Sequence, residues 1–161
     1  MGSRYTGVMA AFHLTKTKDV HYLHGGLTEA LDLSPLVAAA DVPLKLNLGA
    51  VTQINSVGTR TLGQFFKDLG ARPLELHELP GVLVELLNVF PQVFNGRQDA
   101  VQSLYAPYLC DSCQEKPELL LRRQELKVTT RGVTAPLRTC RRCATPMALA
   151  VEPDDYFLFL L

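Results

Sequence analysis

Four cysteines are the residues of this 161-residue chain whose spacing most clearly specifies a chemistry. They form two C-x2-C pairs, Cys110 with Cys113 and Cys140 with Cys143, separated by 26 residues. Two residues between cysteines allow a tight turn to direct both thiolates at one point, and two such turns complete the tetrahedron that zinc accepts. Because four protein ligands leave no open position, the pattern predicts a structural Zn2+ ion rather than a catalytic one.

Two disulfides and a redox-active dithiol are the alternatives for the same spacing. A redox dithiol favours a helix N-terminus after its first cysteine, and no apolar helical pattern follows Cys110 or Cys140. Paired cysteines in a reducing compartment are more often metal ligands than disulfides. We therefore expect zinc. The segment resembles a zinc ribbon, except that Gln114 and Ala144 stand where ribbons often carry a glycine.

Basic residues concentrate between the two cysteine pairs. From Lys116 to Arg142 there are eight basic and two acidic side chains. A nucleic-acid-binding ribbon is therefore the alternative function, although the stretch has no aromatic residue on which a base could stack. That alternative predicts salt-sensitive binding through four arginines: Arg122, Arg123, Arg141 and Arg142.

The composition indicates a globular protein without an overall electrostatic preference. Hydrophobic residues make up 47% of the chain, and 16 basic side chains balance 16 acidic ones. No secretory signal is recognisable, and every apolar run is too short to cross a bilayer. We expect a cytoplasmic protein that does not insert into membranes.

The pattern of strands and helices divides the chain into an α/β part, residues 1–108, and a β-rich part, residues 109–161, packed on it. In the first part, alternating strand and helix signals predict a mostly parallel or mixed sheet covered by helices. Its clearest helix has apolar residues at i, i+3, i+4 and i+7 and ends at Gly70. In the second part, residues 119–136 predict two strands joined at a turn containing Gly132, and residues 156–160 a further strand.

One turn carries a family resemblance. Residues 44–70 read LKLNLGAVTQINSVGTRTLGQFFKDLG, which resembles the core motif of STAS domains, the fold of sulfate-transporter tails and bacterial anti-sigma factor antagonists. Asn47 stands at the strand aspartate of that family, and Asn55-Ser56-Val57-Gly58 at its Asp-Ser-x-Gly turn. Gly25-Gly26-Leu27 is similar to the end of its second strand. The resemblance implies a STAS-like mixed sheet covered by helices.

The resemblance also implies a function for the turn. In the partner-switching branch of the family, the serine of this turn is phosphorylated by a kinase that is itself the binding partner, which makes Ser56 the candidate phosphoacceptor. The alternative is that Ser56 only caps the following helix, and the replacement of both family aspartates by asparagine favours it. The implied partner-binding surface consists of Asn55, Ser56, Val57, Gly58 and Arg60.

No catalytic constellation stands out in the sequence. The four histidines, His13, His21, His24 and His77, lack the spacing of metal ligands or of a catalytic triad. No pair of carboxylates stands out as a catalytic acid and base. We therefore expect a non-enzymatic, STAS-like regulatory module that binds another protein and holds a structural zinc ion. The remaining alternatives are a thiol-redox enzyme and a structural subunit that docks through the apolar tail, residues 157–161; for that tail a strand in the core is the preferred interpretation.

Overall fold

A four-stranded mixed sheet forms the amino-terminal half of the protein. The structure, a computed structural model, describes residues 11–161. The strand order is β1-β2-β3-β4, with β1 antiparallel to β2 and the other neighbours parallel. The strands are β1 (His13–Thr17), β2 (Val20–Leu27), β3 (Leu44–Ile54) and β4 (Leu74–His77). The chain therefore has the α/β architecture that the alternating pattern predicted.

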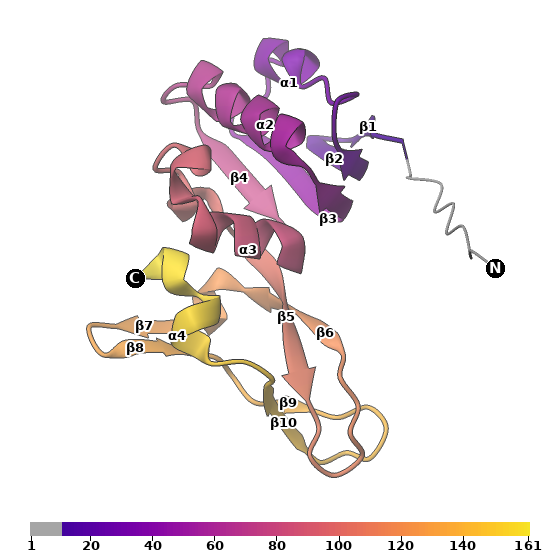
Figure 1. Ribbon diagram of the computed structural model, residues 1–161, viewed down its shortest axis with the longest axis vertical. Coiled ribbons are helices and arrows are strands. Elements are labelled where there is room, and N and C mark those ends of the chain that lie inside the picture. The colour runs from indigo at the N-terminus through magenta and orange to yellow at the C-terminus, as the bar shows by residue number, and fades with distance from the viewer. Residues whose placement is uncertain (1–10) are drawn as a thin grey trace, which may run out of the picture.

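Three helices cover one face of this sheet (Figure 1). They are α1 (Ser34–Ala38), α2 (Ser56–Asp68) and α3 (Gly81–Val89). The alternation of β3 explains the layering, because Leu44, Leu46 and Leu48 are buried while Lys45 and Asn47 between them are only half-buried. Apolar residues of α2 at helical spacing complete the core: Leu62, Phe65, Phe66 and Leu69.

The carboxyl-terminal half contains a second four-stranded sheet and a separate hairpin. The sheet has the order β6-β5-β10-β9 and is antiparallel throughout. Its strands are β5 (Ser103–Leu109), β6 (Glu118–Arg122), β9 (Arg138–Thr139) and β10 (Pro146–Leu149). The hairpin consists of β7 (Lys127–Thr129) and β8 (Gly132–Thr134), and Figure 1 shows it projecting from the body of the protein.

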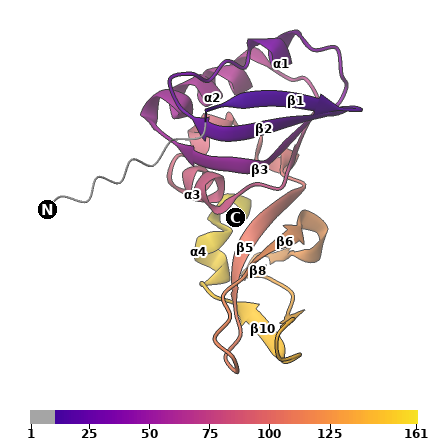
Figure 2. The ribbon, with the colours of Figure 1, turned by 90° about the vertical axis from the view of Figure 1, so that its right-hand side faces the viewer.

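Strand β5 connects the two halves (Figure 2). The sequence pattern predicts a last strand of the α/β part at residues 101–108, but β5 pairs with β6 and β10 instead. Among the described residues, isolated parallel bridges join the start of this segment to β4 and to the residues just after it, Leu76 with Val101 and Leu79 with Leu104. Helix α3 and the turns after it return the chain beside the end of β4, so most of β5 extends beyond the first sheet.

The segment between the cysteine pairs contains more elements than the two strands that the sequence predicts. Residues 119–136 do not form one hairpin, because a short 3-10 helix, η3 (Arg123–Glu125), ends β6 and redirects the chain into β7. The Glu125 carboxylate accepts the backbone N–H of Arg122 at 2.8 Å and so fixes this turn. The turn of the hairpin precedes Gly132, which lies at the start of β8.

The predicted strand at residues 156–160 is wrong. This segment forms α4 (Pro153–Tyr156) followed by the 3-10 helix η4 (Leu158–Leu160), and Phe157 between them is fully buried. Pro153 at the first helical position and two aspartates in the first turn favour a helix start. Asn88 of α3 holds the returning chain, donating to the carbonyl of Tyr156 at 2.9 Å and accepting from the N–H of Phe159 at 3.0 Å.

Two further 3-10 helices, η1 (Pro91–Phe94) and η2 (Gln98–Ala100), link α3 to β5. Among residues 11–161, no helix is both long and apolar enough to cross a membrane.

Candidate metal centre

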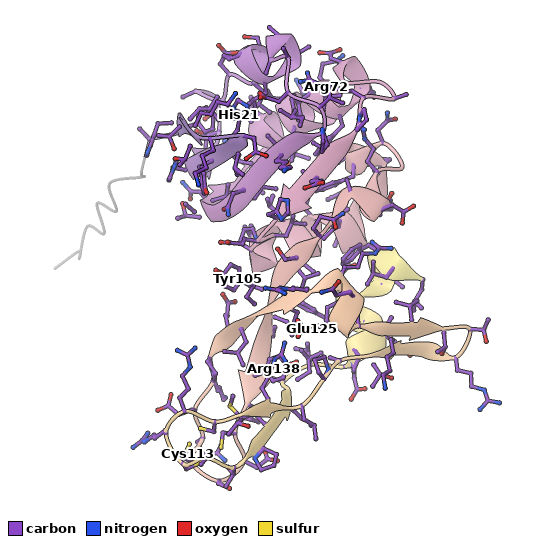
Figure 3. The ribbon with its side chains drawn as sticks, turned by 180° about the vertical axis from the view of Figure 1, so that it is seen from behind. His21, Arg72, Tyr105, Cys113, Glu125 and Arg138 are labelled. Carbon is purple, nitrogen blue, oxygen red and sulfur yellow. The ribbon has the colours of Figure 1, made fainter. Side chains whose placement is uncertain are left out.

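Two equivalent turns bring the four cysteines to the far end of the carboxyl-terminal half, where Figure 3 labels Cys113. Cys110 directly follows β5, and the second pair lies between β9 and β10. Because β5 and β10 are paired neighbours in the sheet, with Leu109 opposite Ala148, the end of one strand lies beside the start of the other. The strand pairing thus explains how cysteines 30 residues apart in sequence converge.

Each turn repeats the same hydrogen bonds. The N–H of Gln114 donates to the carbonyl of Cys110 at 2.8 Å, and the N–H of Ala144 donates to that of Cys140 at 2.9 Å. In both turns the first cysteine N–H in turn donates to the carbonyl five residues further on, at 2.9 Å, which is Glu115 in one turn and Thr145 in the other. The two turns therefore have the same hydrogen-bonding pattern.

Gln114 and Ala144 close these turns in the left-handed conformation, with φ of 61° and 59°. This is the conformation that glycine adopts without steric cost. The sequence difference from glycine-containing ribbons therefore leaves the turn geometry unchanged, at a conformational cost to the two residues.

The four sulfur atoms all lie within 4.8 Å of one another. Cys110 Sγ is 3.4 Å from Cys143 Sγ, and Cys113 Sγ is 3.5 Å from Cys140 Sγ. These separations exceed the S–S bond length of about 2.05 Å, so the cysteines are free thiols. A tetrahedral ion with sulfur ligands at about 2.3 Å would place the sulfurs about 3.8 Å apart, within the range spanned here, and the cluster can therefore hold one metal ion.

Thr145 is a contact of the cluster that sequence reasoning missed. Its hydroxyl lies 3.2 Å from Cys110 Sγ and 3.0 Å from Cys143 Sγ. Hydrogen bonding from this hydroxyl, followed by backbone hydrogen bonding at Cys113, lowers the pKa of Cys110 to about 6. The same hydroxyl lowers the pKa of Cys143. The only sequence signal for this role is a hydroxyl residue two positions after the last cysteine.

Cys113 shows the opposite shift. A backbone N–H at Glu115 lowers the pKa of Cys113, but burial and the neighbouring thiols outweigh it and raise the pKa to about 12. Four thiols this close cannot all ionise unaided, because each thiolate repels the next. A bound cation would remove that repulsion and allow all four to act as thiolate ligands.

Several basic side chains of the carboxyl-terminal half are already paired. Arg142 contacts Glu115 at 2.9 Å, Arg138 contacts Glu125 at 2.9 Å, and Arg123 contacts Asp99 at 3.0 Å. Figure 3 shows Arg138 and Glu125 together on the side of the sheet above the cysteines. Two of the four arginines named for the nucleic-acid alternative, Arg123 and Arg142, are therefore ion-paired, which lowers the unpaired basic charge of this half.

The second predicted site lies at the other end of the molecule, at the start of α2. Asn55 caps this helix: its side-chain oxygen accepts the N–H of Gly58 at 2.9 Å. The interpretation of Ser56 as the capping residue is therefore wrong, since Ser56 is the first residue inside the helix. Its side chain is exposed and makes no hydrogen bond to any residue of the described part of the chain.

The remaining residues of this predicted surface differ in exposure. Val57 and Arg60 are exposed, while Gly58 is buried against the end of β2. A Cβ placed on Gly58 would lie 1.8 Å from the carbonyl oxygen of Leu27. Gly58 thus allows α2 to approach β2 closely and does not itself face solvent.

The histidines do not form a common site. His13 and His24 stack with ring centroids 4.4 Å apart on the first two strands, and His77 lies on β4 beside Glu75. His21 is buried and contacts Asp41 at 2.9 Å. Among the described residues the four cysteines are the only group of His, Cys, Asp and Glu side chains close enough to hold a metal ion.

Comparison with known proteins adds no assignment. No family model matches the chain, and neither a curated protein nor a solved structure does.

Proposed function

We propose that this protein is a non-enzymatic regulatory module, a STAS-like adaptor that binds another protein through the start of α2 and holds one structural zinc ion in a carboxyl-terminal ribbon. The convergence of four free cysteine sulfurs within 4.8 Å supports the ribbon. Four sulfur ligands in a tetrahedral arrangement suit Zn2+ or iron. Zinc is the ion we propose, with Cys110, Cys113, Cys140 and Cys143 as its ligands.

The zinc ion would stabilise the fold and take no part in catalysis, because it would have no free coordination position for substrate or water. The ligands lie next to the ends of β5, β9 and β10, so one ion would tie three strands together. These strands are short, and β9 has only two residues. Metal binding and folding of this half would therefore be one event.

The exposed hydroxyl of Ser56 supports the regulatory part of the proposal. Because Asn55 already caps α2, the Ser56 hydroxyl is available for modification. A phosphate at this position would meet the free backbone N–H groups and positive dipole end of a 13-residue helix. Its added charge would alter the same surface that Val57 and Arg60 present, which is how phosphorylation would control binding.

The shape beside Ser56 also suits a protein partner. A groove of about 580 Å3 runs between the start of α2 and the outer side of α3, lined by Ser56 together with the apolar residues Ile54, Val82, Val89 and Phe90. Val89 and Phe90 are adjacent, 66% and 48% exposed, and give this groove an accessible apolar wall.

A binding experiment tests the regulatory proposal. Tagged wild-type protein, Ser56→Ala, Ser56→Asp and the control Thr130→Asp, in the exposed turn between β7 and β8, are expressed in the native host, and co-purified proteins are quantified by mass spectrometry. We expect a partner that wild type, Ser56→Ala and Thr130→Asp retain and Ser56→Asp loses. Equal recovery of every partner by Ser56→Asp would rule out this surface.

A further inference from the structure

Strand β6 leaves one edge of the carboxyl-terminal sheet open. It is the first strand in the order β6-β5-β10-β9, and no strand of the described part of the chain pairs with its outer side. Figure 1 shows β6 at the margin of the molecule. An open edge of this kind offers unpaired backbone N–H and C=O groups to another strand.

The hydrogen bonds to β5 determine which residues of β6 face outward. The N–H of Tyr108 donates to the carbonyl of Pro117, and the N–H of Arg123 donates to that of Gln102. Odd-numbered residues of this segment therefore direct their backbone groups toward β5, and even-numbered ones direct them away. The outward set consists of Glu118, Leu120 and Arg122.

The side chains of the same three residues also share one face of the sheet. All three are exposed, and Leu120 has a relative exposure of 40%. Neither the Glu118 carboxylate nor the Arg122 guanidinium forms an ion pair among residues 11–161. Within the described residues, the strand thus carries an acid, an apolar residue and a base at alternate positions, and neither charge has an ion-pair partner within 4.0 Å.

From this arrangement we propose that β6 is a dimerisation strand, which pairs antiparallel with β6 of a second copy about a two-fold axis at Leu120. In that register Leu120 meets Leu120, and Glu118 meets Arg122 of the other copy on both sides of the axis. The sequence Glu-Leu-Leu-Leu-Arg is therefore complementary to itself when reversed. A two-fold interface requires this self-complementarity.

The backbone supports the same register. Outward-facing residues pair with outward-facing residues, so the two Leu120 residues exchange two hydrogen bonds. Each Glu118 N–H can donate to the Arg122 carbonyl of the other copy. The Arg122 N–H cannot contribute, since the Glu125 carboxylate already accepts it. A single short strand per copy makes a small interface, so the dimer should dissociate on dilution.

Sedimentation equilibrium across a concentration series tests the proposal on the full chain. Wild type should pass from monomer to dimer as concentration rises. Glu118→Arg and Arg122→Glu each place like charges opposite one another twice, so each should be monomeric over the same range. The double variant Glu118→Arg/Arg122→Glu restores both opposite-charge pairs and should recover the dimer, whereas the control Lys127→Glu on β7 should behave as wild type.

Two further measurements distinguish strand pairing from a general charge effect. An equimolar mixture of the Glu118→Arg and Arg122→Glu chains should form a heterodimer, because each Arg–Arg strand then meets a Glu–Glu strand. Leu120→Pro removes an outward N–H, which an edge strand tolerates, and should abolish dimerisation while circular dichroism remains that of wild type. A monomeric wild type, or a double variant and mixture that stay monomeric, would overturn the proposal.

Discussion

Gly58 offers a sharp test of how α2 packs on the sheet. An added Cβ would lie 1.8 Å from the carbonyl oxygen of Leu27 and 2.5 Å from its carbonyl carbon. Both are backbone atoms, which cannot rotate away as a side chain can. The same carbonyl oxygen accepts the N–H of Asn55 at 3.2 Å, so any movement of the helix away from β2 also stretches the bond that anchors its start.

The expected cost of Gly58→Ala follows from that geometry. To reach even a tight contact of about 3.0 Å, the helix start and the end of β2 must separate by more than 1 Å. Overpacking of this kind in a well-packed core typically costs about 1–3 kcal/mol, and a clash with backbone belongs at the upper end. We expect the free energy of unfolding to fall by about 3 kcal/mol, equivalent to about 6–12 °C in Tm for a chain of this size.

Gly63 in the same helix is the matched control. A Cβ there would meet no atom closer than 3.7 Å, which is ordinary van der Waals contact. Gly63→Ala should therefore gain helix propensity and raise stability by about 0.5–1 kcal/mol. Urea denaturation followed by far-UV circular dichroism compares the two variants. If Gly58→Ala is as stable as Gly63→Ala, α2 does not approach β2 as described, and the account of this glycine fails.

Three further predictions concern the cysteine cluster and the stability of the amino-terminal half at low pH. Cys140→Ser should lose the bound metal and unfold at a lower temperature than wild type, as measured by metal analysis and calorimetry; retained metal would show that the cluster is not the site. Gln114→Gly and Ala144→Gly should each be stability-neutral or raise Tm by a few degrees, because both residues have positive φ; a marked loss of Tm would argue against that conformation. Hydrogen bonds from His21, and then from a lysine, lower the pKa of Asp41 to about 2. The stability this carboxylate contributes is therefore present above its ordinary pKa of about 3.8 and is lost as the pH falls toward 2. Between pH 5 and pH 2, the urea concentration at the midpoint of unfolding should fall less steeply for Asp41→Asn than for wild type. Equal slopes for the two proteins would contradict the lowered pKa of Asp41.

Local patterns in the sequence predicted the first half well. The periodicity of α2 placed its apolar residues in the core, and Gly70 ends the helix with a φ of 54°, as a left-handed C-terminal glycine should. The apolar-rich residues 44–48 likewise predict a buried strand, and they lie in β3. These features are readable because helix and strand periods impose which residues are buried.

The second half was less predictable because tertiary contacts decide it. An apolar run at residues 156–160 fits a strand or a buried helix equally by hydrophobicity, and packing against α3 selects the helix. Similarly, nothing local shows that β5 leaves the first sheet. The cysteine spacing predicted convergence of the four thiols correctly, whereas the contact with Thr145 emerged only from the geometry of the folded turn.

The turn before α2 shows a different limit. The sequence placed Ser56 at a helix start, but the choice between Asn55 and Ser56 as the cap depends on a shift of one residue in the helix boundary. The structure resolves this in favour of Asn55, and so changes Ser56 from a capping group into an exposed hydroxyl.

Native mass spectrometry of the protein purified from its own host, with elemental analysis of the same sample, tests the central claim most directly. We predict one zinc ion per chain, released on acidification, with four free thiols and no visible absorption from an iron–thiolate centre. Metal-free protein whose cysteines form two disulfides, or a stoichiometric iron content in place of zinc, would contradict it.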